Sequence, residues 1–524
     1  MMMPPERRRG CGRLPCWLVV LALLAGCAAP PVVREHGVAL RPGEIEATAL
    51  GRWAREASRT NGGDSGFALL ANGEEAFAVR ARLVEEAERR VDVQTYLMDD
   101  GQTTRVLLRR LLDAAERGVV VRLLLDDVGA IGQARRLTAL DSHPNVQVRV
   151  FNPVAFGRDH LVTWVLAAAP TVWRTHRRMH NKLWVVDNAV AITGGRNLGD
   201  AYYNADESRN FADLDLLAVG PVVDPLSLSF DLYWNHGLAQ PIGRYHAVPA
   251  GAWQALRDEL GGWMEEQRES PYVTALRDRR GVSARDALAE ALHWGRGEAL
   301  WDPPGKLRMP GRPPLEAILG GALEDQLSEL ESRFVIISAY FVPTEIGTRL
   351  LAGLVESGVR VAVITNSLEA GDLPEVHGAY MSRRRALLES GVRLFELRAQ
   401  HHRGDEAAIG ISGSFSSALH IKALSFDDDR LFVGSFNVDP RSLWWNTEVG
   451  VLVESTSLND EFLALADIGM SPALSYEVAL DDAGGLFWLA EVEEELVRLE
   501  REPGSRWHHF RAWLSRVLKL EPWL

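Results

Sequence analysis

The segment that decides the fold is His180-Asn181-Lys182, Asp187 and Gly194-Gly195-Arg196-Asn197, and it occurs twice. The second copy is His420-Ile421-Lys422, Asp427 and Gly434-Ser435-Phe436-Asn437. In both copies four residues separate the lysine from the aspartate, and six separate the aspartate from the first glycine. A match in residue type, order and spacing indicates an internal duplication, so each motif is interpreted as half of a pair.

The chain in front of each copy repeats as well. Apolar runs alternate with helical patterns, and Gly118 and Gly358 each close a helix. The predicted strand, helix and strand cover residues 91–97, 103–117 and 119–125 in the first copy and 334–341, 345–356 and 359–364 in the second. Continuous apolar strands separated by helices predict a parallel sheet covered by helices. We therefore expect an α/β fold of two α/β/α sandwich domains related by a pseudo-twofold axis, with the active site at their interface.

Changes in composition predict the domain boundaries. Between the two copies the chain becomes polar and helical, with Pro/Gly stretches at residues 302–305 and 310–314. The predicted parts are a signal peptide (1–26), an N-terminal linker (27–60), a first domain (61–240), a helical linker (241–315) and a second domain that ends in an amphipathic helix (316–524).

The N-terminus is similar to the export signal of bacterial lipoproteins. Arg7, Arg8 and Arg9 precede an apolar run at residues 14–24, which is shorter than the roughly 20 residues that span a bilayer. The sequence Leu24-Ala25-Gly26-Cys27 resembles a lipobox, which makes Cys27 the predicted lipidated residue. An ordinary signal peptide or a short membrane anchor is the alternative. The prediction is a membrane-anchored lipoprotein of the bacterial cell envelope that faces the periplasm.

Composition limits the remaining function classes. The chain has 524 residues, of which 47% are hydrophobic, and this is enough for two ordinary cores. Its formal net charge of -14 argues against a protein that coats nucleic acid, so no nucleic-acid partner is expected. Cys11, Cys16 and Cys27 are the only cysteines, so a mature domain would hold no disulfide, cysteine-ligated zinc or cysteine nucleophile.

Each motif supplies half of a phosphodiester site. Residues i and i+2 of a strand share a face, so His180 projects with Lys182 and His420 with Lys422. Two such pairs brought face to face would surround a phosphate with two imidazoles and two ammonium groups, without needing a metal or a cofactor. The candidate catalytic residues are His180, Lys182, Asp187, His420, Lys422 and Asp427. For the two aspartates, stabilisation of strands within their own halves is the alternative.

Residues after each motif are candidates for holding the anion. The glycine turns, with Gly195 in the first copy and Ser435 in the second, allow close approach of backbone to a phosphate. Asn197 and Asn437 add neutral donors. Tyr96 is expected on the rim of the same cavity, with core packing as the alternative.

Two further sites follow from position alone. His377 comes after a strand end at Thr365-Asn366, where α/β proteins gather ligands, and we expect it to position substrate. The apolar segment 161–167 either enters the bilayer or belongs to the core. The remaining histidines lack ligand spacing, so no metal site is predicted.

Each catalytic imidazole needs an acceptor on its second nitrogen to fix its tautomer. Candidates occur downstream in Asp213-Leu214-Asp215-Leu216 and in Asn446-Thr447-Glu448-Val449. Alignment of the two stretches pairs Asp215 with Glu448, and these are the predicted orienting residues. Ordinary salt bridges at strand starts are the alternative.

The duplicated motif resembles the two H-K-D motifs of the phospholipase D superfamily. Flanking residues are similar to the C-type bacterial cardiolipin synthases over most of the chain from about residue 60: Ser65-Gly66-Phe67, Gln94-Thr95-Tyr96, residues 174–182, Thr365-Asn366-Ser367 with His377 and Tyr380, and the terminal Leu520-Glu521-Pro522-Trp523-Leu524. The resemblance implies transfer of a phosphatidyl group from one phospholipid to the hydroxyl of phosphatidylglycerol, with phosphatidylglycerol and phosphatidylethanolamine as candidate substrates. Members of that group are not all lipoproteins, so the anchor depends on this sequence alone.

The reaction follows from two histidines in opposite protonation states. A neutral one attacks phosphorus to give a phosphohistidine, and a protonated one donates a proton to the leaving alcohol and then deprotonates the incoming one. The repeat symmetry leaves the assignment open; we take His180 as the nucleophile and His420 as the acid and base. A phospholipase D-type hydrolase, of phospholipid or less favourably of nucleic acid, and a non-catalytic lipid-binding protein of the envelope are the competing hypotheses.

Overall fold

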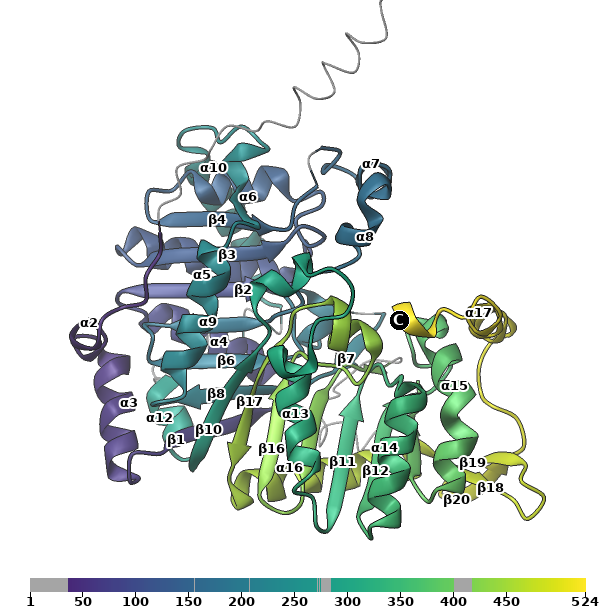
Figure 1. Cartoon of the computed structure of the whole chain (residues 1–524). Coiled ribbons are helices and arrows are strands. Elements are labelled where there is room, and N and C mark those ends of the chain that lie inside the picture. The colour runs from purple at the N-terminus through teal and green to yellow at the C-terminus, as the bar shows by residue number, and fades with distance from the viewer. Residues whose placement is uncertain are drawn as a thin grey trace, which may run out of the picture. The chain divides into compact units, whose positions relative to one another are not determined.

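The fold consists of two copies of one strand order, joined edge to edge. The computed structural model describes residues 36–154, 156–206, 208–270, 272, 274, 284–399 and 417–524. Val38–Leu524 form a single unit, in which the first copy is coloured purple to teal and the second green to yellow (Figure 1). The predicted signal peptide and Cys27 lie outside the described residues.

The first half follows two N-terminal helices, α2 (Pro42–Glu46) and α3 (Ala49–Thr60). Its strands are β1 (Ser65–Leu70), β2 (Arg90–Thr95), β3 (Val120–Asp126), β4 (Val146–Phe151), β5 (Leu183–Val186), β6 (Val190–Gly194), β7 (Asn210–Ala212), β8 (Asp215–Val219) and β9 (Ala239–Pro241). Its helices are α4 (Gly73–Glu86), α5 (Gln102–Glu116), α6 (Ala134–Asp141), α7 (Leu161–Ala168), α8 (Val172–Thr175) and α9 (Val223–Asn235).

The second half repeats this plan after α10 (Ala252–Glu266) and α12 (Ala284–Ala289). Its strands are β10 (His293–Trp301), β11 (Arg333–Ser338), β12 (Arg360–Asn366), β13 (Arg393–Leu397), β14 (Ser417–Leu419), β15 (Lys422–Phe426), β16 (Arg430–Gly434), β17 (Val449–Glu454), β18 (Ser475–Leu480), β19 (Leu486–Val492) and β20 (Glu495–Leu499). Its helices are α13 (Leu319–Leu327), α14 (Thr344–Glu356), α15 (Pro374–Glu389), α16 (Thr456–Gly469) and α17 (Arg506–Val517), with a π-helical turn at Arg441–Trp445.

Strand pairing shows the pseudo-twofold directly. In the described chain, neighbouring strands follow the order β9-β4-β3-β2-β5-β6-β8-β1-β10-β17-β16-β15-β11-β12-β13-β18-β19-β20. Outward from the β1–β10 junction, the two directions match strand by strand as far as β9 and β18, and β19 and β20 extend the second half. The two-domain α/β prediction is therefore confirmed, and equivalent residues of the two halves can be matched by strand.

The sheet is parallel only where helices cross between strands. β2, β3 and β4 are parallel, as are β11, β12 and β13, and the helices between them begin and end close to their predicted limits. Gly118 and Gly358 end α5 and α14 with φ of 98° and 97°, a conformation that glycine adopts without steric cost. The motif strands pair antiparallel, so the sheet is mixed where the sequence predicted a parallel one.

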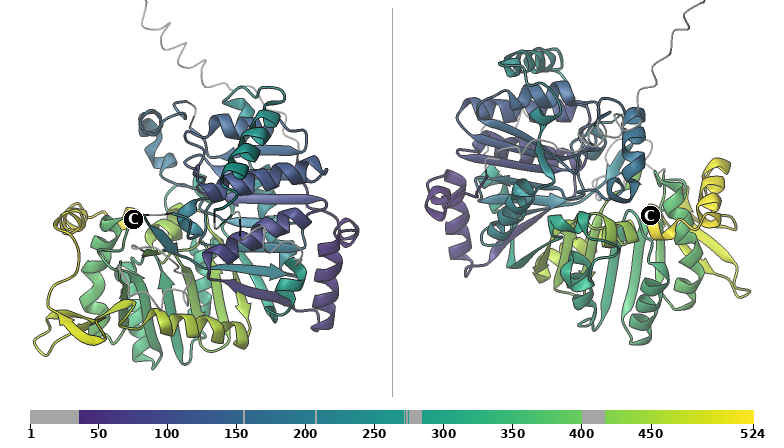
Figure 2. Two further views of the ribbon diagram at one scale, coloured as in Figure 1. Left: turned by 180° about the vertical axis from the view of Figure 1, so that it is seen from behind. Right: turned by 45° about the horizontal axis from the view of Figure 1, so that its top comes forward.

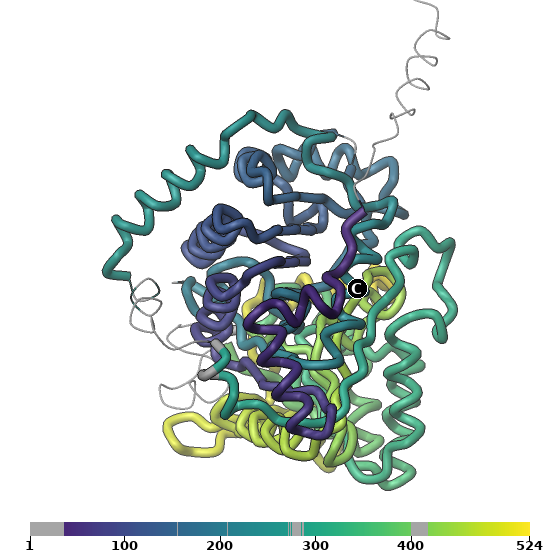
Figure 3. The backbone as a smooth tube through the Cα atoms, turned by 90° about the vertical axis from the view of Figure 1, so that its left-hand side faces the viewer, coloured from purple at the N-terminus to yellow at the C-terminus, as the bar shows by residue number. Residues whose placement is uncertain are grey.

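The predicted linker at 241–315 is wrong in extent. Helix α10 lies along the outside of the first half, which Figure 3 shows as a teal arch. Strand β10 pairs with β1 on one side and β17 on the other, so it is the first strand of the second half. Gly295 and Gly297 make this possible, because a Cβ there would lie 2.1 Å from the Glu454 carbonyl oxygen and 2.5 Å from the Phe67 ring. Polar composition concealed this strand.

The junction of the halves is a shared core. One apolar cluster contains residues of both, including Phe67 and Leu216 from the first half and Val451 and Phe462 from the second. The halves are thus packed through buried side chains as well as through strand pairing. In the part of the chain that the structure describes, no helix is both long enough and apolar enough to cross a bilayer.

Candidate active site

The segment in front of each His-x-Lys sequence leaves its own half and pairs with the other. β14 runs parallel to β7, and Met179 forms the matching parallel bridge with Thr447. The histidine is the next residue of each segment. The backbone N–H of His180 donates to the Thr447 carbonyl (2.9 Å), and that of His420 donates to the Ala212 carbonyl (2.7 Å). Both histidines are therefore held at the junction of the halves.

A polar side chain at the end of a parallel strand of the same half holds each of these segments in place. Asp126, at the end of β3, accepts from the Met179 N–H (2.9 Å) and from Arg178 Nε (2.8 Å). Asn366, at the end of β12, accepts from the Leu419 N–H (2.8 Å) and donates to the Leu419 carbonyl (2.9 Å). These buried contacts leave little freedom for the backbone that carries the histidines.

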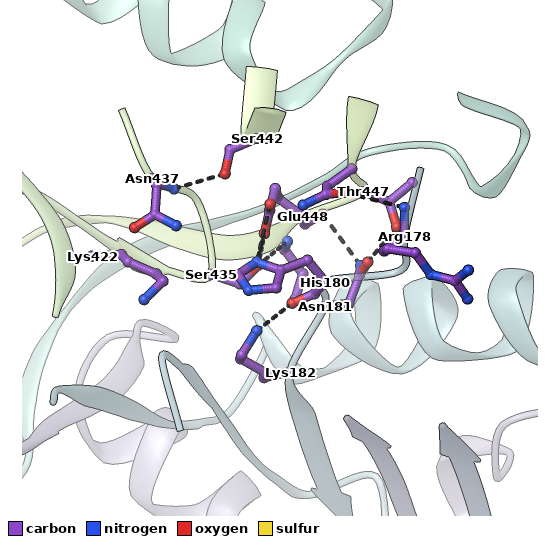
Figure 4. Close-up of polar contacts among 12 residues, drawn as sticks. Arg178, His180, Asn181, Lys182, Lys422, Ser435, Asn437, Ser442, Thr447 and Glu448 are labelled. Carbon is purple, nitrogen blue, oxygen red and sulfur yellow. Dashed lines mark hydrogen bonds and ion pairs between the residues drawn. The ribbon is translucent and has the colours of Figure 1, made fainter. Parts of the chain in front are cut away.

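Each imidazole pairs with a carboxylate from the opposite half. His180 Nδ1 lies 2.9 Å from Glu448 Oε2, and His420 Nδ1 lies 2.6 Å from Asp213 Oδ2 (Figure 4 shows the His180 pair). Both carboxylates are fully buried. Because Nδ1 of each ring faces a carboxylate, Nε2 is the nitrogen left for chemistry.

Asp215 is not an orienting residue, so that prediction is wrong. The Gly195 N–H donates to the Leu214 carbonyl, as the Ser435 N–H does to the Val449 carbonyl, so the equivalent of Glu448 is Asp213. Asp215 forms buried ion pairs with Arg80 (2.8 Å) and Arg196 (3.1 Å). Residues two apart in a strand point to the same face, so the sequence alone did not distinguish Asp213 from Asp215 and the alignment was wrong by two residues.

Gly195 and Ser435 contact the carboxylates, whereas the sequence predicted that they bind phosphate. Ser435 Oγ donates to Glu448 Oε2 at 2.5 Å. A Cβ at Gly195 would lie 2.0 Å from Asp213 Oδ1, so only glycine leaves room for that carboxylate. The two equivalent positions thus fix the carboxylates in different ways.

The two lysines lie beside their histidines and are buried. Lys182 Nζ donates to the His180 carbonyl (2.7 Å), and Lys422 Nζ donates to the His420 carbonyl (2.6 Å). Burial lowers the pKa of both ammonium groups, that of Lys182 to about 7. An anion bound between them would reverse that effect, because opposite charge favours the protonated amine.

Only one of the two predicted asparagine donors is available. Asn197 accepts from the Leu97 N–H (3.1 Å) and donates to the Tyr202 hydroxyl (2.8 Å), so its carboxamide is already used. The Asn437 side chain lies near Lys422 in Figure 4, and its carboxamide forms no hydrogen bond with the described residues, so its Nδ2 group is the donor left for an anion. Phosphate binding by Asn197 is not what the structure indicates.

Asp187 and Asp427 lie at the far ends of the motif strands. Asp187 accepts from the backbone N–H groups of Glu88, Arg89 and Arg90, and Asp427 binds the start of β11 in the same way. Asp187 is five residue steps along the chain from Lys182, roughly 16 Å when extended. The prediction of catalytic contact is therefore corrected: both aspartates tie the start of a parallel strand to the motif hairpin.

Charge distinguishes the two imidazoles. Burial, followed by the Lys182 and Lys422 ammonium groups, lowers the pKa of His180 well below its ordinary value. Burial also raises the pKa of Glu448 to about 7, so this carboxyl is a weak source of negative charge. Burial alone would raise the pKa of Asp213, but His420 and Lys422 outweigh it and lower that pKa. Burial and Lys422 lower the pKa of His420 as well, while the ionised Asp213 partly offsets them.

Aromatic rings border both histidines. The Tyr96 ring lies edge-on to His180 with centroids 5.0 Å apart, and Lys182 Nζ is 5.4 Å from the Tyr96 centroid. Tyr202 lies edge-on to His420 at 5.2 Å, and Phe211 lies 5.1 Å away. The sequence pointed to Tyr96 but missed Tyr202 and Phe211, because neither belongs to a repeated motif.

His377 belongs to a separate buried ion-pair cluster, which we call the Glu502 cluster (His377, Arg384, Glu396 and Glu502). His377 Nε2 lies 2.6 Å from Glu502 Oε1, and Nδ1 faces the Asn366 carbonyl. Arg384 Nη2 contacts Glu502 (2.5 Å) and Glu396 (3.1 Å). Among the described residues, only His377, Glu396 and Glu502 are spaced to hold a metal ion, and the Arg384 guanidinium already binds this group. The predicted substrate role of His377 is therefore wrong: both ring nitrogens face protein partners.

The sequence is similar to that of known proteins from one family. The family model described as "Cardiolipin synthase, PLD-like domain" matches residues 81–213 and 323–467. "Cardiolipin synthase C" of Escherichia coli strain K12 is 36% identical over 465 residues, covering 88% of this chain and 96% of that protein. "Cardiolipin synthase" of Staphylococcus aureus strain Mu50 is 24% identical over 457 residues, 87% and 73% of the two chains.

A solved structure shares the fold. The phosphatidylserine synthase of Haemophilus influenzae Rd KW20 superposes with a TM-score of 0.52 at 14% identity, covering 81% of this chain and 91% of that one. Two copies of one α/β unit, crossed histidine–carboxylate pairs and the matching family model agree. The chain therefore belongs to the cardiolipin synthase family of phospholipase D-like proteins, and it is an enzyme of the phosphatidyltransferase and phospholipase D type.

Proposed function

We propose that this enzyme transfers a phosphatidyl group from one phospholipid to the hydroxyl of phosphatidylglycerol, forming cardiolipin through a phosphohistidine. The observation that carries the proposal is the crossed pairing of His180 with Glu448 and of His420 with Asp213, which leaves two Nε2 atoms free at one junction. The 36% identity to the Escherichia coli protein supports the choice of substrate.

His180 is the proposed nucleophile and His420 the proposed acid and base. His180 Nε2 forms a bond to phosphorus while the bond from phosphorus to the leaving alcohol oxygen breaks, and His420 gives that oxygen its proton. The acceptor hydroxyl then gives its proton to His420, and its oxygen displaces His180 from phosphorus. The charge pattern supports this order, because the ionised Asp213 favours imidazolium at His420 and the cations around His180 favour the neutral ring.

Lys182, Lys422 and Asn437 are the proposed partners of the phosphate oxygens. Each lies at the junction beside a histidine or its lysine, and each is almost fully buried. A phosphodiester anion would be bound by two ammonium groups and one amide in a site from which water is largely excluded, where such contacts are strongest. Tyr96 is proposed to pack against the bound substrate next to His180.

The proposed substrate is a lipid, and the surface offers a place for a membrane. Large apolar side chains are exposed on α7 and α8 (Leu161, Val162, Leu166, Trp173) and on α17 (Trp507, Phe510, Trp513). Figures 1 and 2 show these helices on the same side, next to the C-terminus. Exposed Arg506, Arg516 and Lys519 accompany the aromatic residues of α17 and suit an anionic headgroup region. Lipidation of Cys27 and a periplasmic location remain part of the proposal.

The test is a reconstitution with purified protein. Phosphatidylglycerol vesicles, with and without phosphatidylethanolamine, should yield cardiolipin, and a quenched reaction should carry the covalent phosphoryl group on the peptide that contains His180. His180→Ala and His420→Ala should both abolish turnover, whereas His143→Ala, which removes an imidazole packed against Trp253, should not. Release of phosphatidate without cardiolipin would favour the hydrolase instead. A phosphopeptide containing His420 would reverse the assigned roles.

A further inference from the structure

We propose that an apolar groove in the second half binds one acyl chain of a phospholipid substrate; the identity of this ligand rests on the proposed function. The groove has a volume of about 560 Å³ and lies between α13, α14 and the sheet. Sites for small organic ligands commonly enclose about 300–1,000 Å³, so the space suits a long-chain lipid tail. The catalytic roles described above do not involve this groove.

The groove has a buried apolar floor and an open rim. Its floor is formed by Phe334 and Ile336 of β11 and Leu424 and Phe426 of β15, and its walls include Leu323 of α13 and Leu350 of α14. Ile346 at the rim is 66% exposed, so the space is open to the surface. Apolar cavities bind apolar guests readily, because water gains few hydrogen bonds there.

The groove lies directly behind the active site. Side chains alternate along the motif segment after β16: Ser435 contacts Glu448 and Asn437 lies near Lys422, while Phe436 and Val438 line the groove. One backbone therefore separates the proposed phosphate position from the groove. A lipid whose phosphate lies between the histidines has its tail within reach of this space.

The matching place in the first half is packed differently. The equivalent of Phe436 is Arg196, whose buried guanidinium is bound by carbonyls and by Asp215. The cavity at that place is only about 20 Å³, lined by Arg80, Arg196 and Tyr203 among others. Aromatic rings pack beside it, with Phe77 5.6 Å from Tyr203 and 5.4 Å from Tyr272 between ring centroids. The duplicated fold thus does not require a groove of about 560 Å³, and its size in the second half indicates a function specific to that half.

The end of the groove adjoins the surface that we propose contacts the membrane. Pro522 of the C-terminal segment lines the groove, and the next residue, Trp523, is 57% exposed. Arg312, also on the rim, packs over Trp444 at 5.3 Å and is available to a headgroup. A tail that leaves the bilayer beside the C-terminus would enter the groove from this end. This continuity favours a membrane lipid over a peptide as the occupant.

The test fills the groove without touching the catalytic residues. Gly347 of α14 lines the groove, and a Cβ there meets only Pro343 Cβ at 3.2 Å. Gly353 of the same helix lies away from the groove, and a Cβ added there would meet no atom of the described residues within 4 Å. Gly347→Phe and Gly353→Phe are therefore a matched pair. Binding of cis-parinaric acid, a fluorescent long-chain fatty acid, is titrated with wild type and both variants, and turnover is compared for dipalmitoyl and dihexanoyl phosphatidylglycerol.

We expect wild type and Gly353→Phe to bind the fatty acid equally and Gly347→Phe to bind it at least ten-fold more weakly. The kcat/KM ratio of long-chain to short-chain lipid should fall about as much in Gly347→Phe alone. Equal fatty-acid binding by both variants would overturn the proposal. So would a dimer of the wild type that Gly347→Phe converts to monomer without a loss of fatty-acid binding, because a second copy would then occupy the groove. Binding needs no turnover, so failure of the proposed function, with no lipid consumed, is distinguishable from failure of the groove.

Discussion

Replacing Asp213 with asparagine tests the crossed pairing most directly. Asp213 Oδ2 lies 2.6 Å from His420 Nδ1 in a fully buried setting, and the ionised carboxylate favours the protonated imidazole. A hydrogen bond to a charged group contributes about 1.5–3 kcal/mol. Since one pKa unit corresponds to about 1.4 kcal/mol, Asp213→Asn should lower the pKa of His420 by about 1–2 units. The maximal rate should fall by about 10- to 150-fold.

The assay is the pH dependence of kcat with saturating phosphatidylglycerol vesicles. Loss of the anion disfavours imidazolium, so His420 loses its proton at lower pH and the alkaline limb should move about 1–2 pH units toward acid. Asp215→Asn is the matched control: it weakens ion pairs with Arg80 and Arg196, so it should lower the melting temperature and leave the pH limbs in place. An unchanged profile in Asp213→Asn, or a shifted one in Asp215→Asn, would refute the assignment.

Three further predictions concern other parts of the molecule. Gly195→Ala places a Cβ 2.0 Å from Asp213 Oδ1, so its pH profile should shift in the same direction as that of Asp213→Asn; a normal profile would contradict the packing argument. Trp507→Ser combined with Trp513→Ser should weaken binding to phosphatidylglycerol vesicles, measured by sedimentation, by about ten-fold per residue. The melting temperature should not change, because both rings are exposed and each buries apolar area only in the membrane. Equal sedimentation would exclude α17 from the membrane contact. Burial alone would raise the pKa of Glu502, but hydrogen bonds and ion pairs in the Glu502 cluster outweigh it and lower that pKa from 4.5 to about 2. The ionised Glu502 therefore stabilises the folded protein by about 3 kcal/mol above pH 4.5, and this stabilisation is lost as the pH falls toward 2. Glu502→Gln should therefore melt lower than wild type at neutral pH and like wild type near pH 2, and a gap that persists in acid would count against this assignment.

The duplication made most of the fold predictable from sequence. Matching spacing after His180 and His420 revealed two copies of one unit, and the glycines at 118 and 358 located the ends of the crossover helices. Strand β10 was missed because its glycines allow the close approach of β1 and β17, which is a property of the tertiary structure and leaves no periodic apolar pattern. The antiparallel motif strands likewise look like parallel ones, since both are apolar throughout.

The site was predictable in its residue types but less so in its contacts. Both histidines lie in segments bound to the opposite half, and the partner of His420 is Asp213 and not its neighbour two residues on. Residue spacing along a strand shows which residues share a face, but not which of them contacts the histidine. The carboxylates also pair with histidines of the opposite half, and the distance along the sequence does not predict such contacts. His377 shows the same limit: a strand end suggested a ligand, and a glutamate from the far C-terminal region pairs with it instead.

The crossed pairing has a consequence for how such a molecule could arise. A single ancestral unit would present an imidazole without its carboxylate and a carboxylate without its imidazole, so it would be inert until two identical subunits associated. Duplication and fusion would make that association permanent and free each copy to diverge. The glycine and serine at positions 195 and 435, and the filled and hollow flanks of the two halves, are traces of that divergence.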